Sequence, residues 1–142
     1  MPNPSLSPRR TAWGLLLLRI LVALVFLTEG IQKLLFPAPF GPGRFAKIGI
    51  PAPQFTGPFV GCVEIVCGAM LIACFYTTLA VVPLLIAILV AVATTKVPML
   101  VHQGFWAAMH AARADFCMLL GLIAIALLGA GDLSMDERRR AG

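Results

Sequence analysis

Charged residues are scarce in this sequence of 142 residues: Asp, Glu, Lys and Arg make up 12%, whereas hydrophobic residues make up 60%. Soluble domains average about 25% charged and about 45–50% apolar residues. Because so few polar side chains cannot cover a water-soluble globule, the composition excludes an ordinary soluble domain. A mean hydropathy of +0.95 favours the lipid bilayer as the solvent, and the length predicts a single membrane domain over residues 1–142.

The sequence also lacks the short motifs that carry self-contained catalysis. It contains no nucleophile elbow, phosphate-binding glycine loop, haem-attachment motif or zinc-ligand spacing. Its four cysteines form no C-x-x-C pair and lie in apolar runs, where free cysteine behaves as a small packing residue. His102 and His110 are eight residues apart, which is weak evidence for a metal, and we expect none. Whether the chain is an enzyme stays open; at most it is an oxidoreductase subunit.

The net charge of +5 comes largely from basic residues that flank apolar runs. Arg9 and Arg10 precede the first run, and three arginines at 138–140 follow the last. Nucleic-acid binding needs a solvent-facing basic patch on a folded domain, so we expect no nucleic-acid partner. Cations beside apolar segments follow the positive-inside pattern instead, which predicts a lipid bilayer around the chain and cytoplasmic N- and C-termini.

Four apolar runs approach the roughly 20 helical residues needed to cross a hydrocarbon core. The segment 36–58 separates the first two and holds six prolines, which predicts an ordered extramembrane loop with one or two helical turns within 43–50. Pro98 is expected to stop the third helix and to leave a loop over 98–114. The predicted fold is all-α, an integral membrane four-helix bundle with a Pro/Gly-rich loop between helices 1 and 2. Its spans are 12–36, 58–76, 79–97 and 115–130, with polar tails at 1–11 and 131–142.

The few charges in or beside these spans are the candidate site residues, because a charge in the bilayer centre costs about 2.5–3.5 kcal/mol on insertion scales and normally finds a partner. Arg19 and Glu64 lie inside spans and are a candidate pair. Glu29 and Lys33 have the spacing and order of a favourable helical ion pair. Asp115 is suited to cap the fourth helix. A polar cluster is expected at one end of the bundle, comprising Glu29, Lys33, Glu64, Lys96, His102, Arg113 and Asp115, with Arg19 deeper in the membrane.

An alternative stays open for most of these residues taken singly. Lys33, Lys96 and Arg113 are long enough to extend to the membrane interface without any further role. Asp115 could serve only to cap a helix, and the two histidines could simply lie in a loop that faces water. Glu64 is different, because a buried carboxylate is costly unless it has a specific partner or function.

The order of these motifs resembles the DoxX family of small bacterial membrane proteins, part of a DoxX/DoxD-like group. The resemblance covers nearly the whole chain and rests on Arg19, FLTEGIQKLLF over 26–36, GIP over 49–51, Glu64 followed by Gly68, Asp115, and the closing GAGDLSMDERR. Where the family often has a histidine before the glycine, this sequence has Glu29. The resemblance implies a multi-pass protein of the bacterial inner (cytoplasmic) membrane. Relatives are linked to sulfur-compound oxidation with electrons passed to quinone, and to redox complexes that handle thiol or oxidative stress.

Three functions follow as hypotheses. The first is a membrane subunit or anchor of a redox system, quinone-linked or thiol/sulfur-related, with quinone as cofactor and a redox enzyme as partner. Glu64, Glu29 and His102 would then exchange protons, and Lys33 or Arg113 would stabilise a reduced anionic form. The second is a non-enzymatic scaffold or assembly factor that uses the segments 36–58 and 97–110 as contact surfaces. The third is a small transporter, which would need a homo-oligomer because four helices leave a narrow pore.

Overall fold

A computed structural model describes residues 8–129, and within that range the regular structure is helical throughout. Four helical segments are long and apolar enough to cross a membrane: Arg9–Leu35, Pro53–Ala73, Thr77–Gln103 and Phe105–Leu128. The prediction of an all-α membrane protein with four spans is therefore confirmed. Most of the two predicted polar tails lies outside the described residues. The elements are α1 (Pro8–Leu35), α2 (Pro42–Lys47), α3 (Pro53–Ala73), α4 (Thr77–Ala91), the π-helical turn η1 (Val92–Lys96), α5 (Val97–Gln103) and α6 (Phe105–Leu128).

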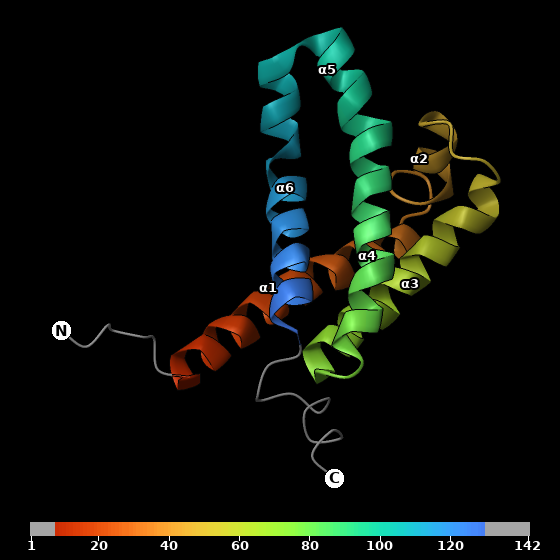
Figure 1. Ribbon diagram of the computed structural model, residues 1–142. Helices are drawn as coiled ribbons and strands as arrows, with labels where there is room; N and C mark the ends of the chain where they lie inside the picture. The colour runs from red at the N-terminus through yellow and green to blue at the C-terminus, as the bar shows by residue number, and fades with distance from the viewer. Residues whose placement is uncertain (1–7, 130–142) are drawn as a thin grey trace.

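The long helices form two antiparallel pairs that cross each other (Figure 1). α4 and α6 stand side by side and are joined through α5, whereas α1 and α3 run obliquely across them. α3 and α4 are neighbours joined by a tight turn in which Cys74 and Tyr76 have positive φ of 54° and 45°, as expected for a very short connection. The core lies where all four helices meet, and its most buried apolar residues include Val22, Ala23, Leu71, Leu84, Leu122 and Ile125.

Small residues allow α1 and α3 to approach closely. A Cβ atom on Gly30 of α1 would lie 2.6 Å from the Gly61 carbonyl oxygen, and one on Gly68 would lie 3.2 Å from the Ala23 carbonyl oxygen. Glycine and alanine at such contacts are typical of membrane helices, whose backbones then pack directly. Glu64 lies three residues after Gly61 and four before Gly68, so helical periodicity places it on the face of α3 that meets α1.

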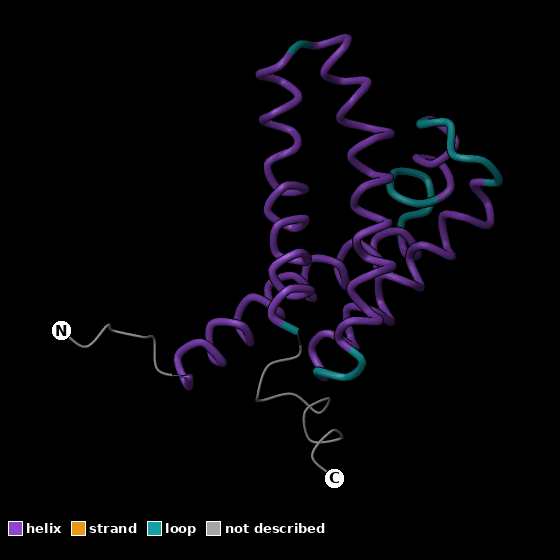
Figure 2. The backbone as a smooth tube through the Cα atoms, in the orientation of Figure 1, coloured by secondary structure: helices purple, strands orange, loops and turns teal. Residues whose placement is uncertain are grey.

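The Pro/Gly-rich segment folds back on the start of α3. The predicted turns within 43–50 are confirmed as α2, whose Phe45 is buried. A Cβ atom on Gly57 of α3 would lie only 2.8 Å from the Pro42 nitrogen, so α2 rests directly on the first turns of α3. The teal loops on either side of α2 are visible in Figure 2. α3 begins at Pro53, five residues before the predicted start of the span, and Pro58 lies inside it.

The prediction that Pro98 ends the third helix and begins a loop over 98–114 is wrong. The helix continues through η1 and α5 to Gln103. Proline has no N–H and crowds the carbonyl four residues earlier, and the wider π-turn before it, in which the Val97 N–H donates to the Val92 oxygen, accommodates that defect. The chain reverses at Gly104, whose φ is 88°, and α6 begins at Phe105. Asp115 therefore lies within α6, and the predicted capping role is wrong.

The close α1–α3 contact generates the first testable expectation. In Gly30→Ala, the new methyl group would overlap the Gly61 carbonyl, so the two helices must separate. Overpacking of this kind costs about 1–3 kcal/mol, and we expect a lower thermal unfolding temperature for the purified protein in detergent. Gly14→Ala is the matched control, because a Cβ atom there meets nothing within 4 Å. Equal unfolding temperatures for the two variants would contradict the close packing of this seam.

Candidate functional site

A cavity of about 970 Å³ opens among α1, α2, α3, α4–η1 and α6. Most of its wall is apolar, with contributions from Phe26, Phe45, Val63 and Met118. Two groups of charged side chains interrupt this apolar wall, one on the α1–α3 side and one between η1 and α6. The cavity is thus a largely apolar space with two ion-pair groups in its wall.

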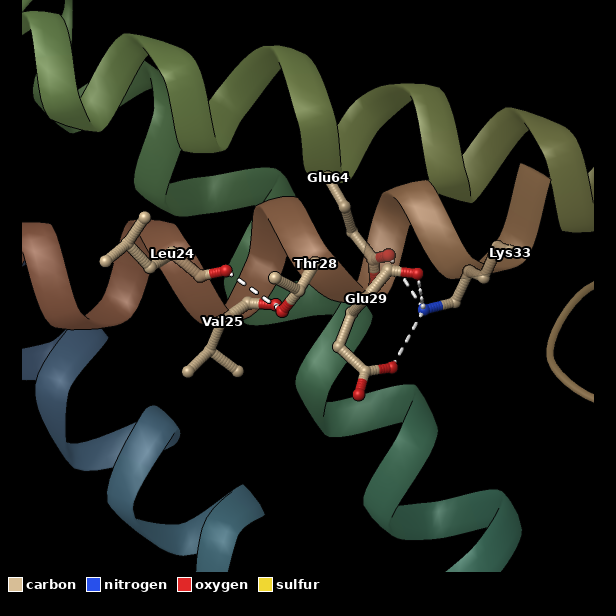
Figure 3. Close-up of polar contacts among 6 residues, drawn as sticks. All are labelled: Leu24, Val25, Thr28, Glu29, Lys33 and Glu64. Carbon is tan, nitrogen blue, oxygen red and sulfur yellow. Dashed lines mark hydrogen bonds and ion pairs between the residues drawn. The ribbon is translucent and has the colours of Figure 1, made fainter. Parts of the chain in front are cut away.

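Lys33 is the centre of the first charged group (Figure 3). Its Nζ lies 2.8 Å from Glu64 Oε2 and 3.4 Å from Glu29 Oε2, which confirms the predicted Glu29–Lys33 helical pair. Glu64 is only 5% exposed, whereas Glu29 is exposed. The neighbouring Thr28 hydroxyl donates to the carbonyls of Leu24 and Val25 and takes no part in this group. One ammonium thus serves two carboxylates, and the group carries a net charge of −1 when all three are ionised.

Lys96 and Asp115 form the second charged group, with Lys96 Nζ 3.2 Å from Asp115 Oδ2. This contact is an ion pair without hydrogen-bond geometry, and the buried Oδ2 accepts no hydrogen bond within the described part of the chain. Both side chains are partly buried. Asp115 therefore keeps the capacity to accept a hydrogen bond from a molecule in the cavity.

Arg19 lies at the opposite end of the bundle, and its predicted pairing with Glu64 is wrong. The guanidinium is 1% exposed; Nη1 donates to Cys74 Sγ at 3.0 Å and Nη2 donates to the Gly129 carbonyl at 3.2 Å. Cys74 and Gly129 are the C-cap residues of α3 and α6. Because the C-terminal end of a helix carries partial negative charge, Arg19 is stabilised there by two helix ends and holds α1 against both.

The structure brings five of the predicted cluster residues to the cavity and leaves two outside it. Glu29, Lys33, Glu64, Lys96 and Asp115 line the cavity. His102 lines a second, smaller pocket, and Arg113 is exposed and contacts the ring of His110 instead. The two histidines therefore share no site.

Sequence reasoning missed several polar residues of the cavity wall. Arg44, Thr56, Thr94 and Thr95 also line it. The Thr94 and Thr95 hydroxyls donate to the carbonyls of Val90 and Ala91 one turn earlier. The run of two threonines before Lys96, at the end of an apolar helix, was the available signal, because polar residues inside a span normally face the protein interior.

Comparison with known proteins agrees with this architecture. The profile of the DoxX family matches residues 14–103. The chain is 48% identical over 127 residues to the uncharacterized membrane protein Rv3486 of Mycobacterium tuberculosis, and the match covers 85% of this chain and 78% of that protein. No solved structure matches the chain. The matched region includes Arg19, both acids that contact Lys33, and Lys96.

The Lys33–Glu64 pair generates the second testable expectation. Lys33→Met leaves a buried carboxylate without its cation, and breaking a buried pair in this way costs about 3–5 kcal/mol. We expect a large drop in stability, measured by thermal or SDS unfolding of the purified protein. The double variant Lys33→Met/Glu64→Gln should recover part of the loss, because no buried charge then remains unpaired.

Glu29→Gln is the matched control for this cycle. It removes an exposed carboxylate from the same lysine, and an exposed pair contributes only about 0–1 kcal/mol. If Lys33→Met were no more destabilising than Glu29→Gln, the Lys33–Glu64 pair would not be a structural contact of the bundle.

Proposed function

Since this chain belongs to the DoxX family of membrane proteins, we propose that it is the membrane subunit of a redox system and that its cavity binds a lipophilic quinone. The observation that carries the proposal is the combination of a cavity of about 970 Å³ with two separate ion-pair groups on largely apolar walls. A quinone is a flat apolar ring with carbonyl oxygens and a hydrocarbon tail, so it needs this combination.

The residues of the cavity fit such a molecule. Ligand pockets are typically about 300–1,000 Å³, mostly apolar, with a few polar groups that fix orientation. Phe26, Phe45 and Met118 supply apolar contact, whereas the ammonium groups of Lys33 and Lys96 supply hydrogen-bond donors for carbonyl oxygens. Each of these lysines lies next to a carboxylate that can accept a proton, Glu64 beside Lys33 and Asp115 beside Lys96.

When bound, the quinone would supply the electron-accepting ring, and the chain's own residues would position it and manage protons. The Lys33 ammonium would orient a carbonyl oxygen and offset negative charge that develops there. Glu64 Oε and Asp115 Oδ2 would hold or pass protons at the cavity wall. The burial of Glu64 limits water around that carboxylate, which strengthens its electrostatic interaction with Lys33. Electrons would come from a redox-enzyme partner.

The proposed setting is the bacterial inner membrane with both chain termini cytoplasmic, supported by Arg9 and Arg10 beside the first span and the arginines at 138–140. In that orientation α2 and the adjacent cavity lie toward the periplasmic side, because α1 runs from the N-terminal end of the bundle to α2 (Figure 1). A partner enzyme that exchanges electrons with the cavity would then bind at the periplasmic face. Association of several copies of the chain is also compatible with this role.

Quinone binding is tested with the purified protein in nanodiscs and a photoreactive quinone analogue, with labelled peptides identified by mass spectrometry. We expect labels on segments that line the cavity, and at least about tenfold weaker labelling in the double variant Lys96→Met/Asp115→Asn, which removes both charges of one group together. Arg113→Gln is the control, because Arg113 lies outside the cavity at the same end of the bundle. Labelling spread evenly over lipid-facing segments, or unchanged in the double variant, would refute the quinone site.

A scaffold role is the second candidate, favoured by the exposed apolar side chains around the α5–α6 turn. Trp106 is 83% exposed, and Phe105 and Val101 beside it are exposed as well. The double variant Phe105→Ser/Trp106→Ser should release a bound partner from the native complex while leaving quinone labelling intact. Affinity purification with quantitative mass spectrometry measures this, and retention of every partner would count against the scaffold role.

A further inference from the structure

A second pocket of about 580 Å³ lies beside the cavity, between the end of α2 and the η1–α5 segment. Its polar lining comes from Lys47, Thr94, Thr95, His102 and Gln103; we refer to it as the outer pocket. We propose that the outer pocket binds the phosphate group of an anionic membrane phospholipid, with one acyl chain of that lipid entering the cavity. The proposal goes beyond the quinone site and does not depend on it, although the acyl chain and the quinone would share the cavity.

The charge of the outer pocket differs from that of the cavity. Each lysine of the cavity has a carboxylate within 3.2 Å. Lys47, by contrast, lines a pocket whose lining contains no acidic residue, and neither Lys47 nor Arg44 one turn earlier makes an ion pair within residues 8–129. His102 and Gln103 add N–H donors. A lysine without a counter-charge, with these donors beside it, favours an anion at this position.

The outer pocket lies at the depth of lipid head groups. The segment Thr77–Gln103 has 27 residues and is about 40 Å long at 1.5 Å per residue, whereas the hydrocarbon core is about 30 Å thick. The excess of about 10 Å falls at the polar end, because residues 79–93 are apolar and polar residues begin at Thr94. Basic pockets between membrane helices are suited to anionic lipid head groups.

The nearness of the cavity favours a lipid over a small soluble anion. Ile48, Thr94 and Thr95 line both the outer pocket and the cavity, so the two spaces adjoin across these residues. A phosphate held at Lys47 therefore has an apolar space directly behind it. An acyl chain would gain from that space, whereas inorganic phosphate would not.

The test is native mass spectrometry of the full-length protein in detergent, titrated with phosphatidylglycerol or with zwitterionic phosphatidylcholine. We expect phosphatidylglycerol to bind at least tenfold more tightly than phosphatidylcholine. The variant Lys47→Gln/His102→Gln should abolish that preference, and because both side chains are exposed it should fold normally. Arg113→Gln removes a charge at the same membrane end outside both spaces, so it should leave the preference unchanged. If Arg113→Gln lost the preference for phosphatidylglycerol to the same extent, general surface charge would explain the preference, and the proposed site would be overturned.

Thr95→Trp distinguishes a phospholipid from free inorganic phosphate as the ligand, because the larger side chain fills the space between the outer pocket and the cavity without removing charge. We expect it to weaken phosphatidylglycerol binding at least fivefold. Full binding in Thr95→Trp, together with displacement of the lipid by millimolar inorganic phosphate, would mean a free-phosphate site and would overturn the acyl-chain assignment. Quinone photolabelling of Lys47→Gln/His102→Gln keeps the two proposals separate: labelling should persist there even though the lipid is lost.

Discussion

The ion pair between Lys33 and Glu64 joins α1 to α3 inside the membrane, and the wall of the cavity depends on it. A carboxylate as buried as Glu64 is costly in a bilayer and normally has a partner at close range. That range is available because Gly30 and Gly61 bring the two backbones together, so the small-residue contact and the charged contact support each other. Glu29 adds a second carboxylate to the same lysine from an exposed position. The pair is therefore both a link between helices and a polar group presented to the cavity.

Buried cations are stabilised by different kinds of groups at the two ends of the bundle. Arg19 is stabilised at the C-terminal ends of α3 and α6 by hydrogen bonds to the Cys74 sulfur and the Gly129 carbonyl oxygen, and neither contact involves an acid. At the other end, Lys33 and Lys96 are neutralised by carboxylates. A carboxylate can take up and release a proton, whereas an arginine guanidinium stays protonated. Arg19 is therefore held by helix ends, whereas the buried carboxylate of Glu64 and its lysine lie at the end of the bundle that contains the cavity.

The four spans could be predicted because the apolar runs have the length that the bilayer thickness requires. The Glu29–Lys33 pair could be predicted because helical periodicity places these two side chains side by side. The partners of Arg19 could not be predicted from the sequence, because they are the ends of two other helices, α3 and α6, rather than an acidic side chain. The start of α1 at Pro8, well before Arg19, also places this residue deeper in the helix than expected. The prediction that the third helix ends at Pro98 was wrong for a related reason. Whether a proline ends a helix depends on the hydrogen bonds of the preceding turn. The cavity depends on the angles at which the helix pairs cross, and those angles follow from packing of the whole chain.

The π-turn at Val92–Lys96 connects these features into one arrangement. A π-turn holds one residue more than an α-turn, and one residue corresponds to a rotation of about 100° around the helix axis. That extra residue changes which side chains of the third span face inward at its polar end. In the observed register Thr94, Thr95 and Lys96 line the cavity, and the two threonines also face the outer pocket. The same local defect that accommodates Pro98 thus sets Lys96 opposite Asp115 and places Thr94 and Thr95 beside both the cavity and the outer pocket.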